Sequence, residues 1–484
     1  MKILIAASEA VPFAKTGGLA DVTGSLLNEY KKMKLEPAII LPFYRKIKTA
    51  VRDFGIKPLG KKISVPLGNQ FEIGKIWKGK TPEGADAYFI ENDNFYDRND
   101  LYGTPEGDFP DNAARFTFYN RAVLETLKTL ELKFDVIHCN DWQTGLIPVY
   151  TKTLYKNIFA KTATLMTIHN LGYQGLFWSI DMPMTGFGWE LFNIEGLEFY
   201  GKINFLKGGI MFSDIITTVS NNYAKEILTS EHGFGLDGVL RKRNNDLYGI
   251  INGINYNIWD PEKDTHLPYS YSIRDLSGKT KCKKSLQKEC GFSLNDSPLI
   301  GMVTRFSSQK GLDLVAEVMG KIVNLGMQVV ILGKGDEYFH ETFLALQKKY
   351  RKSLSVTIGF NDSLAHKIYA GSDIFLMPSK YEPCGLGQLI ALRYGTIPVV
   401  RKTGGLVDTI IEYNTSDRTG TGFLFNGYSS GEMLEALKRA NKFFNDKAAW
   451  LKIKKNSMSQ DFSWRHSAEE YLSLYQKAMK KKEQ

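Results

Sequence analysis

Two nearly identical glycine turns stand near the two ends of the chain. The first is KTGGLADV, from Lys15 to Val22, and the second is KTGGLVDT, from Lys402 to Thr409. Each turn follows an apolar run and precedes a helical pattern, so its backbone N–H groups can face an anion at a helix N-terminus. In the first turn, Gly17 and Gly18 leave the backbone open and Lys15 adds a positive charge. The pair predicts anion binding, although a single glycine turn is as often structural.

Charged residues follow two further apolar runs in the second half of the chain. RFSSQKG places Arg305 directly after one run and Lys310 just before a helical pattern, where two cations and a helix N-terminus suit a diphosphate. MPSKYEPCGLGQL places Glu382 after another run, next to a Pro-Cys-Gly-Leu-Gly stretch that lets the backbone approach a ligand. The structural alternatives are surface cations on a loop and an acid that complements a helix dipole.

Histidine and aspartate residues follow two strands of the first half. HCNDW contains His138 and Asp141, and TIHNLGYQG contains His169 and Asn170. A single histidine at a strand end is more often structural, but His169, with Asn170 and two glycines close behind it, is more typical of a site. The sequence contains no His/Cys/Asp cluster with metal-ligand spacing and no GxSxG elbow. We therefore expect no bound metal.

Short apolar runs alternate with longer amphipathic segments along the chain. Continuous apolar strands separated by helical patterns are typical of parallel βαβ units with helices on both faces. The first series of expected strands is Lys2–Ala7, Ala38–Leu41, Ala87–Ile90, Val136–Cys139, Thr164–Ile168 and Ile215–Val219. The second series is Leu299–Thr304, Gln328–Leu332, Leu354–Ile358, Ile374–Met377 and Ile397–Val400. The pattern predicts an α/β fold with two doubly wound domains.

A stretch rich in Asn, Gly, Pro and Tyr, Leu247–Tyr271, separates the two series and is typical of a connector. We place the domain boundary near Asp260–Tyr269 and expect a final amphipathic helix at about Arg465–Lys480. The predicted division is 1–262 for an N-terminal domain, 263–462 for a C-terminal domain and 463–484 for a C-terminal helix. Ligands of doubly wound sheets bind outside the carboxyl ends of the strands, so residues directly after strands are the first candidates.

The bulk composition excludes several classes of protein. The net charge of +10 suits an enzyme that handles a nucleotide better than a nucleic-acid binder, because the lysines are spread along the chain. No apolar run approaches the roughly 18–20 residues that span a bilayer. The four cysteines lack paired spacing, which fits a reducing compartment. We expect a cytoplasmic protein without nucleic-acid or membrane partners.

Taken together, these motifs resemble the bacterial glycogen synthase and plant starch synthase family, retaining glucosyltransferases of the GT-B architecture. The resemblance rests on KTGGLADV, HCNDW, TIHNLGYQG, RFSSQKG, PSKYEPCGLGQL, RKTGGLVDT and the terminal DFSW, which keep the family's order and span essentially the whole chain. It implies two Rossmann-like domains facing a deep cleft, with the terminal helix crossing back to the N-terminal domain. It also implies glucose transfer from ADP-glucose to the non-reducing end of an α-1,4-glucan or maltooligosaccharide, without cofactor or metal.

The resemblance also implies a role for each matching residue. Arg305 and Lys310 would grip the phosphates, Glu382 would hold the glucose hydroxyls, and Phe360 would stack on the adenine. The implied catalytic set is Glu382, His169, Asp141, Arg305 and Lys310. The implied substrate-binding set is Lys15, Gly17, Gly18, Asp21, Asn170, Arg305, Lys310, Phe360, Glu382, Cys384, Gly385, Leu386, Gly387, Thr403, Gly404 and Gly405. Many relatives in the wider superfamily carry a second glutamate in an E-x7-E pattern, but Ile390 stands there, which leaves the ribose without that carboxylate.

Several alternatives stay open. With Glu382 as the only strong acidic candidate, we expect a front-side reaction in which the leaving phosphate takes the acceptor's proton. UDP-glucose is an alternative donor, because a stacking Phe360 accepts either base. An α-glucan phosphorylase would need a lysine that holds pyridoxal phosphate, and no convincing segment is found for one. A dinucleotide oxidoreductase would need GxGxxG and an acid about 20 residues further on. A non-catalytic glucan-binding protein would be expected to lose some of these charged residues.

Overall fold

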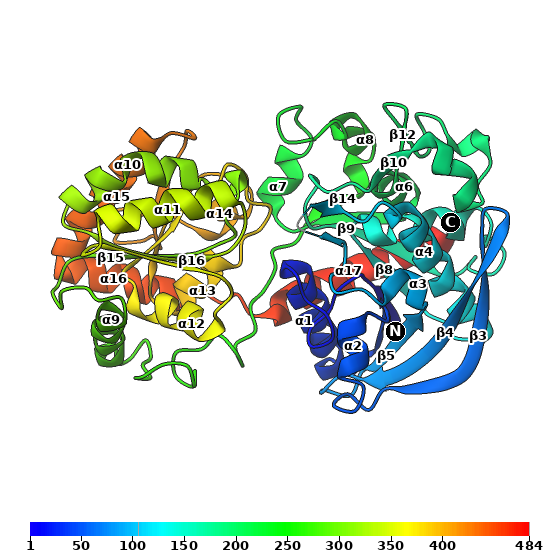
Figure 1. The fold of residues 1–484 in the computed structure, drawn as a ribbon, viewed down its shortest axis with the longest axis horizontal. Coiled ribbons are helices and arrows are strands. Elements are labelled where there is room, and N and C mark those ends of the chain that lie inside the picture. Colours follow the sequence, from blue (N-terminus) through cyan, green and yellow to red (C-terminus); the bar gives the residue numbers. More distant parts are fainter. Residues whose placement is uncertain (105, 484) are drawn as a thin grey trace. The chain divides into compact units, whose positions relative to one another are not determined.

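A computed structural model describes residues 1–104 and 106–483 of the chain (Figure 1). It divides into two compact units. Unit 1 comprises Met1–Ile250 together with the C-terminal helix α17 (Trp464–Glu483), and unit 2 comprises Ile251–Ser463. Within the described residues, every helix is too short or too polar to cross a membrane.

Unit 1 is built on a nine-stranded sheet with the order β14-β13-β9-β8-β1-β2-β5-β4-β3. The strands from β14 to β5 are parallel, whereas β4 and β3 form an antiparallel hairpin at one edge. The strands are β1 (Lys2–Ala6), β2 (Glu36–Pro42), β3 (Lys57–Leu67), β4 (Gln70–Lys80), β5 (Asp86–Glu91), β8 (Val136–Asn140), β9 (Ala163–Ile168), β13 (Ile215–Thr218) and β14 (Leu247–Gly249).

Helices cover both faces of this sheet. Helix α1 (Gly18–Lys32) contacts β2 and α17, whereas α4 (Asn112–Thr129) contacts α5 (Leu146–Lys152), and α5 contacts α6 (Phe205–Phe212). Helix α17 packs beside α1 and lies across β9. The smaller elements are α2 (Arg45–Thr49), α3 (Asp93–Tyr96), β6 (Gly103–Thr104), β7 (Gly107–Asp108), η1 (Trp142–Thr144), β10 (Leu176–Trp178), η2 (Ser179–Thr185), η3 (Trp189–Leu191), β11 (Glu198–Phe199), β12 (Lys202–Asn204), α7 (Asn221–Glu226), α8 (Asp237–Lys242) and η4 (Asn244–Asp246).

Unit 2 contains a fully parallel six-stranded sheet with the order β17-β16-β15-β18-β19-β20. Its strands are β15 (Leu299–Val303), β16 (Gln328–Gly333), β17 (Leu354–Ile358), β18 (Ile374–Met377), β19 (Ile397–Arg401) and β20 (Phe423–Phe425). Numbered along the chain this is 3-2-1-4-5-6, the order of a Rossmann sheet. Read from β5, the parallel strands of unit 1 begin with the same order. The two doubly wound units predicted from the sequence are therefore confirmed.

Two apolar cores sandwich the unit 2 sheet. In β16, Val329 and Ile331 enter one core, whereas Val330 and Leu332 enter the other. This burial on both sides explains why the strand is a continuous apolar run. The helices are α9 (Ser277–Glu289), η5 (Ser308–Lys310), α10 (Leu312–Asn324), α11 (Glu337–Lys349), α12 (Asp362–Gly371), α13 (Gly387–Arg393), α14 (Gly405–Thr409), α15 (Ser430–Asn445) and α16 (Lys447–Met458). Figure 1 shows α10, α11 and α15 on one face of the sheet, and α9, α12 and α13 on the other.

All eleven strands predicted from apolar runs are present, with ends that differ by at most two residues. The sequence analysis missed the β3–β4 hairpin. The first six residues of β3 are exposed, so this strand lacks the apolar run that marks a buried one.

The boundary between the units differs from the one predicted near Asp260–Tyr269, because the units divide after Ile250. The segment that follows is held by unit 2: the Asp264 carboxylate accepts hydrogen bonds from Tyr394 Oη at 2.5 Å and from His366 Nδ1 at 2.7 Å. Turn-forming composition marks the change of segment, but these tertiary contacts decide to which unit it belongs.

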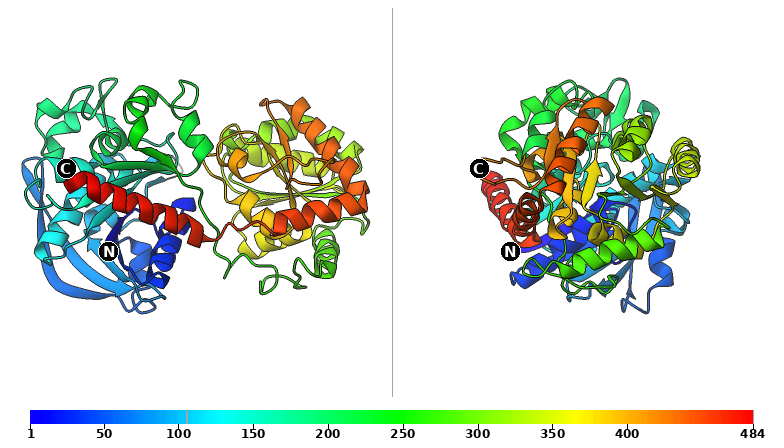
Figure 2. Two further views of the ribbon diagram at one scale, coloured as in Figure 1. Left: turned by 180° about the vertical axis from the view of Figure 1, so that it is seen from behind. Right: turned by 90° about the vertical axis from the view of Figure 1, so that its left-hand side faces the viewer.

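Helix α17 is fixed to unit 1 through a buried hydroxyl. The Tyr475 hydroxyl lies 2.8 Å from Tyr30 Oη and 2.7 Å from His138 Nδ1. Figure 2 shows the helix running across the sheet of this unit. His138 is fully buried, and this burial lowers its pKa to about 3, so the ring is neutral and structural.

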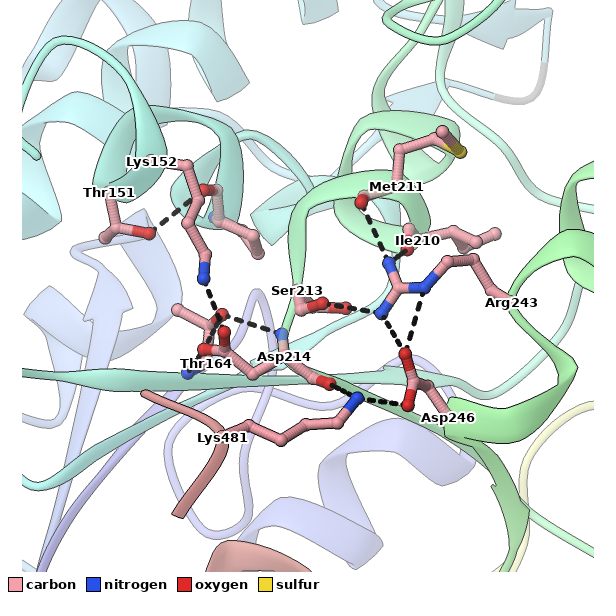
Figure 3. A network of polar contacts seen from close by, with 11 residues as sticks. Thr151, Lys152, Thr164, Ile210, Met211, Ser213, Asp214, Arg243, Asp246 and Lys481 are labelled. Atoms are coloured by element: carbon pink, nitrogen blue, oxygen red, sulfur yellow. Dashed lines mark hydrogen bonds and ion pairs between the residues drawn. The ribbon is translucent and has the colours of Figure 1, made fainter. Parts of the chain in front are cut away.

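The far end of α17 is held by a polar network (Figure 3). Lys481 bonds the Asp246 carboxylate and donates to the Asp214 carbonyl at 3.3 Å. Arg243 donates to the Ile210 and Met211 carbonyls at 2.6 and 2.8 Å, which satisfies the last turn of α6. Charged side chains from distant segments therefore anchor the C-terminal helix.

Candidate active site

The residues predicted to do chemistry follow strands at the topological switch point of each sheet. The strand order reverses between β1 and β8 in unit 1 and between β15 and β18 in unit 2. Lys15 follows β1 and Asp141 follows β8, whereas Lys310 follows β15 and Glu382 follows β18. Ligands of open α/β sheets bind outside the carboxyl ends of the strands at this point. Each unit therefore presents its charged residues where the fold binds ligands.

Lys310 and Glu382 form a largely buried ion pair in unit 2. The Lys310 ammonium lies 2.9 Å from Glu382 Oε1 and 2.7 Å from Oε2, and the two side chains are 15% and 8% exposed. Ser379 Oγ donates to Oε2 at 2.9 Å. Helix α13 begins at Gly387 and has no side-chain cap, so Glu382 makes no capping bond to it. Lys310 is paired and largely buried, so it is not an unpaired surface cation. The surface-cation alternative is thus wrong for Lys310.

The second glycine turn is docked onto the backbone of Glu382. The Gly405 N–H donates to the carbonyls of Glu382 and Pro383, each at 3.1 Å. Gly404 has φ +47°, and a Cβ atom placed on it would lie 1.8 Å from the Glu382 carbonyl oxygen. The turn therefore needs glycine at position 404 in order to hold Glu382 in place. The Thr403 hydroxyl in the same turn is buried and has no hydrogen-bond partner among the described residues.

The loop from Cys384 to Gly387 is held from beneath by Gln388. Its Nε2 donates to the carbonyls of Cys384 and Gly385 at 2.9 and 3.0 Å. Burial raises the pKa of the Cys384 thiol to about 12, so this thiol stays protonated and does not act as a nucleophile. Gln388 was not predicted as a site residue. It is the second residue of α13, and only its place directly after the Pro-Cys-Gly-Leu-Gly stretch could have indicated this role. Leu386 and Gly387 stand at the N-terminus of that helix.

Arg305 and Phe360 are exposed on loops of unit 2. Arg305 Nη2 lies 3.5 Å from Gln309 Oε1, and Phe360, after β17, is 85% exposed. Neither side chain supports the core, so each is available to a ligand. Ile390, where the wider superfamily carries a second acid, is 5% exposed and packs in an apolar core with Tyr271 and Leu389.

The first glycine turn is held by Glu9, an acid that belongs to none of the motifs found in the sequence. Glu9 is buried, and its carboxylate accepts hydrogen bonds from the Thr16 N–H and, at 3.2 Å, from the Gly17 N–H. The Gly17 amide therefore already faces an internal anion. Lys15 pairs with Asp21 at 2.8 Å on the exposed side of the same turn. The signal for Glu9 in the sequence is an acid shortly after the first strand, a position where ligand-binding residues are expected.

Asp141 adopts a backbone conformation that is almost confined to glycine. Its φ and ψ are 56° and −177°, which costs about 1–3 kcal/mol. The strained turn aims the carboxylate at the next strand end, where Oδ1 accepts the His169 N–H at 2.8 Å. Burial raises the pKa of Asp141 to about 7, against the opposing effect of the backbone N–H groups of His169 and Asn170. Asp141 is therefore poised to change its charge near neutral pH.

His169 is a neutral ring with a defined tautomer. Asn140 Nδ2 donates to the carbonyls of Ala6 and His138 at 3.1 and 3.2 Å, which orients its Oδ1 toward His169 Nε2 at 2.9 Å. Because Oδ1 only accepts, Nε2 carries the proton and Nδ1 is the acceptor. Burial lowers the His169 pKa to about 3. Within residues 1–104 and 106–483, no group of three or more His, Cys, Asp or Glu residues could hold a metal ion.

Two Rossmann-like units with charged residues at both switch points are the features of a GT-B glycosyltransferase, and comparison with known proteins shows this class. Residues 2–242 match the family described as starch synthase catalytic domain, and residues 286–457 match glycosyl transferases group 1. The glycogen synthase of Thermosipho melanesiensis is 49% identical over 487 residues and covers 100% of both chains. The chain belongs to the glycogen synthase and starch synthase family, which are glucosyltransferases.

Solved structures agree with this assignment. The catalytic domain of starch synthase IV from Arabidopsis thaliana, bound to ADP and acarbose, superposes with a TM-score of 0.90 at 32% identity, covering 99% of each chain. Sucrose-phosphate synthase from Thermosynechococcus elongatus superposes with a TM-score of 0.60 at 15% identity, which shows the fold alone.

Proposed function

We propose that the chain transfers glucose from ADP-glucose to the non-reducing end of an α-1,4-glucan, with retention of configuration, and releases ADP. The observation that carries this proposal is the buried Lys310–Glu382 pair at the switch point of unit 2. It sets a cation for the phosphates beside an acceptor for the sugar hydroxyls. ADP and acarbose bound to the related starch synthase support a nucleotide diphosphate and an α-glucan as ligands.

The charged residues have separate roles in the reaction. The bond between glucose C1 and the diphosphate oxygen breaks, and the acceptor's 4-hydroxyl oxygen forms a new bond to C1. Arg305 and Lys310 stabilise the negative charge that grows on the leaving diphosphate, and preorganised charge of this kind contributes about 10²–10³ in rate per donor. Glu382 holds the glucose through its hydroxyls. Unit 1 contributes Lys15 as a cation for a diphosphate, and Asp141 and His169 as partners for sugar hydroxyls.

The proton of the acceptor hydroxyl can be removed without a carboxylate base. Double displacement would need a carboxylate nucleophile about 5–5.5 Å from an acid. Glu382 is occupied by Lys310 and Ser379 and is assigned to sugar binding. The departing phosphate oxygen therefore takes the proton from the acceptor hydroxyl on the same face of the sugar. His169, neutral and with Nδ1 as an acceptor, is able to bind a sugar hydroxyl without changing its charge.

The choice of sugar donor and the cellular location rest on separate observations. Phe360 is able to stack on either adenine or uracil, so ADP-glucose is preferred because of the ADP-bound relative. All four cysteines are free, which supports a cytoplasmic location.

One assay tests the proposal. Purified protein is incubated with ADP-glucose or UDP-glucose and maltotetraose, with or without a chelator, and both nucleotide release and product length are measured. We expect ADP release with stepwise elongation, unaffected by the chelator. Faster transfer from UDP-glucose would overturn the donor, strict dependence on added Mg²⁺ would contradict the metal-free reaction, and release of glucose 1-phosphate from glucan and phosphate would indicate a phosphorylase.

A further inference from the structure

The Glu9 carboxylate lies beneath the first glycine turn with both of its oxygens engaged. Oε2 accepts from the Thr16 and Gly17 N–H groups, and Oε1 accepts from Thr16 Oγ1 at 2.6 Å and from Tyr102 Oη at 2.6 Å. Glu9 is 3% exposed. A buried carboxylate is costly unless such donors surround it, so the four bonds hold this part of the chain in one arrangement.

The bonds converge on the residues that follow Lys15. Thr16 contributes both its N–H and its hydroxyl, and Gly17 is the N-cap residue of α1. The Lys15 side chain leaves the same turn on its exposed side and bonds Asp21 in the first turn of α1. Glu9 therefore determines the backbone from which the Lys15 ammonium projects, although the two side chains lie on different sides of the turn.

Tyr102 ties Glu9 to a separate segment. Its hydroxyl lies 2.7 Å from Ser8 Oγ as well as 2.6 Å from Glu9 Oε1. The carboxylate is thus held on one side by Tyr102 and in turn holds the glycine turn on the other. These bonds on two sides hold the Glu9 carboxylate, and with it the glycine turn, in one position.

The second glycine turn is held in a different way. There the Gly405 N–H donates to main-chain carbonyls, and Thr403, which corresponds to Thr16, has no partner for its hydroxyl among the described residues. The Gly405 N–H therefore bonds main-chain carbonyls, whereas the Gly17 N–H bonds a side-chain carboxylate.

We propose that Glu9 is a positioning residue for the diphosphate of the sugar donor and acts by fixing the turn that carries Lys15. The inference rests on the role proposed for Lys15. Glu9 makes no contact with the substrate. Its negative charge satisfies the turn's own N–H groups, which leaves the Lys15 ammonium as the group that this turn offers to the donor.

Kinetics of Glu9→Gln and Tyr102→Phe test the inference, with Tyr96→Phe as the matched control. Tyr96 is fully buried, whereas Tyr102 is partly buried, and the Tyr96 hydroxyl donates to the Arg115 carbonyl rather than to Glu9. We expect Glu9→Gln to lower kcat/KM for the donor about 10- to 100-fold, the effect of weakening a charge-assisted bond. Tyr102→Phe should have a smaller effect in the same direction, and the control should leave kcat/KM unchanged.

A double-variant cycle separates positioning from a general structural role. If Glu9 acts through Lys15, Glu9→Gln should cost less than about threefold in a Lys15→Ala background. An equal loss in both backgrounds would overturn the inference. A Lys15→Ala variant with normal activity would instead contradict the role proposed for Lys15, so the two failures are distinguishable.

Hydrogen exchange supplies a readout that does not depend on activity. In Glu9→Gln, the amides of Thr16 and Gly17 should exchange faster, whereas the amides of β1 and of the last turns of α1 should keep their protection. Unchanged exchange at both turn amides would overturn the inference, as would a uniform loss of protection throughout unit 1.

Discussion

Lys310 Nζ lies 2.7 and 2.9 Å from the two carboxylate oxygens of Glu382, a residue that is 72 positions further along the chain. The two parallel strands β15 and β18 lie side by side at the switch point and bring these residues together. The pair couples the group assigned to the phosphates with the group assigned to the glucose. A change in either one alters the charge and position of the other.

Removing one member of this pair should impair both rate and stability. Lys310→Ala should lower kcat about 10²–10³-fold, because a donor to the leaving group is lost. It should also lower the free energy of unfolding by up to about 3–5 kcal/mol, because Glu382 keeps a buried charge without its partner. The double variant Lys310→Met with Glu382→Gln should recover stability but not activity, and Lys321→Ala, an exposed lysine on α10, should change neither. Equal stability of all these variants in urea would contradict the coupling.

Arg305→Ala should separate catalysis from folding. The side chain is exposed and lies 3.5 Å from Gln309, a weak contact, so the free energy of unfolding should change by less than about 0.5 kcal/mol. Turnover should nevertheless fall about 10²–10³-fold if the guanidinium stabilises the leaving diphosphate. Single-turnover kinetics and urea denaturation measure the two effects. Near-normal turnover would remove Arg305 from the proposed site.

The two glycine turns should differ in their tolerance of alanine. Gly404→Ala places a Cβ 1.8 Å from the Glu382 carbonyl oxygen, so the backbone must move at a cost of about 1–3 kcal/mol, and Glu382 moves with it. A Cβ on Gly17 meets no atom within 4 Å, and its φ of −148° suits any residue. Gly17→Ala should therefore keep its thermal midpoint, and Gly404→Ala should lose both stability and activity. A stable, active Gly404→Ala enzyme would show that the turn does not position Glu382.

Asp141 should make the folded state less stable as the pH rises. Its pKa is about 7 in the folded protein and 3.8 in the reference state, so between these values the folded protein holds a proton that the unfolded chain has lost. This contribution to stability is complete below pH 3.8 and is lost as the pH rises through 7, with a slope of up to about 1.4 kcal/mol per pH unit.

Asp141→Asn should therefore become more stable than the parent as the pH increases from 5 to 8, because asparagine keeps the acceptor but does not ionise. Urea unfolding at several pH values measures the difference. The exposed Asp53→Asn is the control, and its difference from the parent should not depend on pH. Parallel profiles for Asp141→Asn and the parent would contradict the raised pKa.

Much of the fold could be predicted because burial on both faces of a parallel sheet leaves a plain apolar run. β17, Leu354–Ile358, has the predicted ends, and Arg305, Lys310 and Glu382 follow strands as expected. The β3–β4 hairpin and the unit boundary could not be found in this way. Exposed strands lack that pattern, and membership of a unit depends on contacts such as Asp264 with His366.

The candidate site was likewise predictable only in part. Residue types and their place after strands determined the charges that the protein offers: Lys15, Asp141, Arg305, Lys310 and Glu382. Only the tertiary structure decided the partners of these groups, such as Glu9 beneath the first turn, the Lys310–Glu382 pair, and the strained Asp141 backbone. Strand position follows from local patterns of hydrophobicity, whereas the pairing and the pKa of a side chain depend on neighbours that the chain brings together from distant segments.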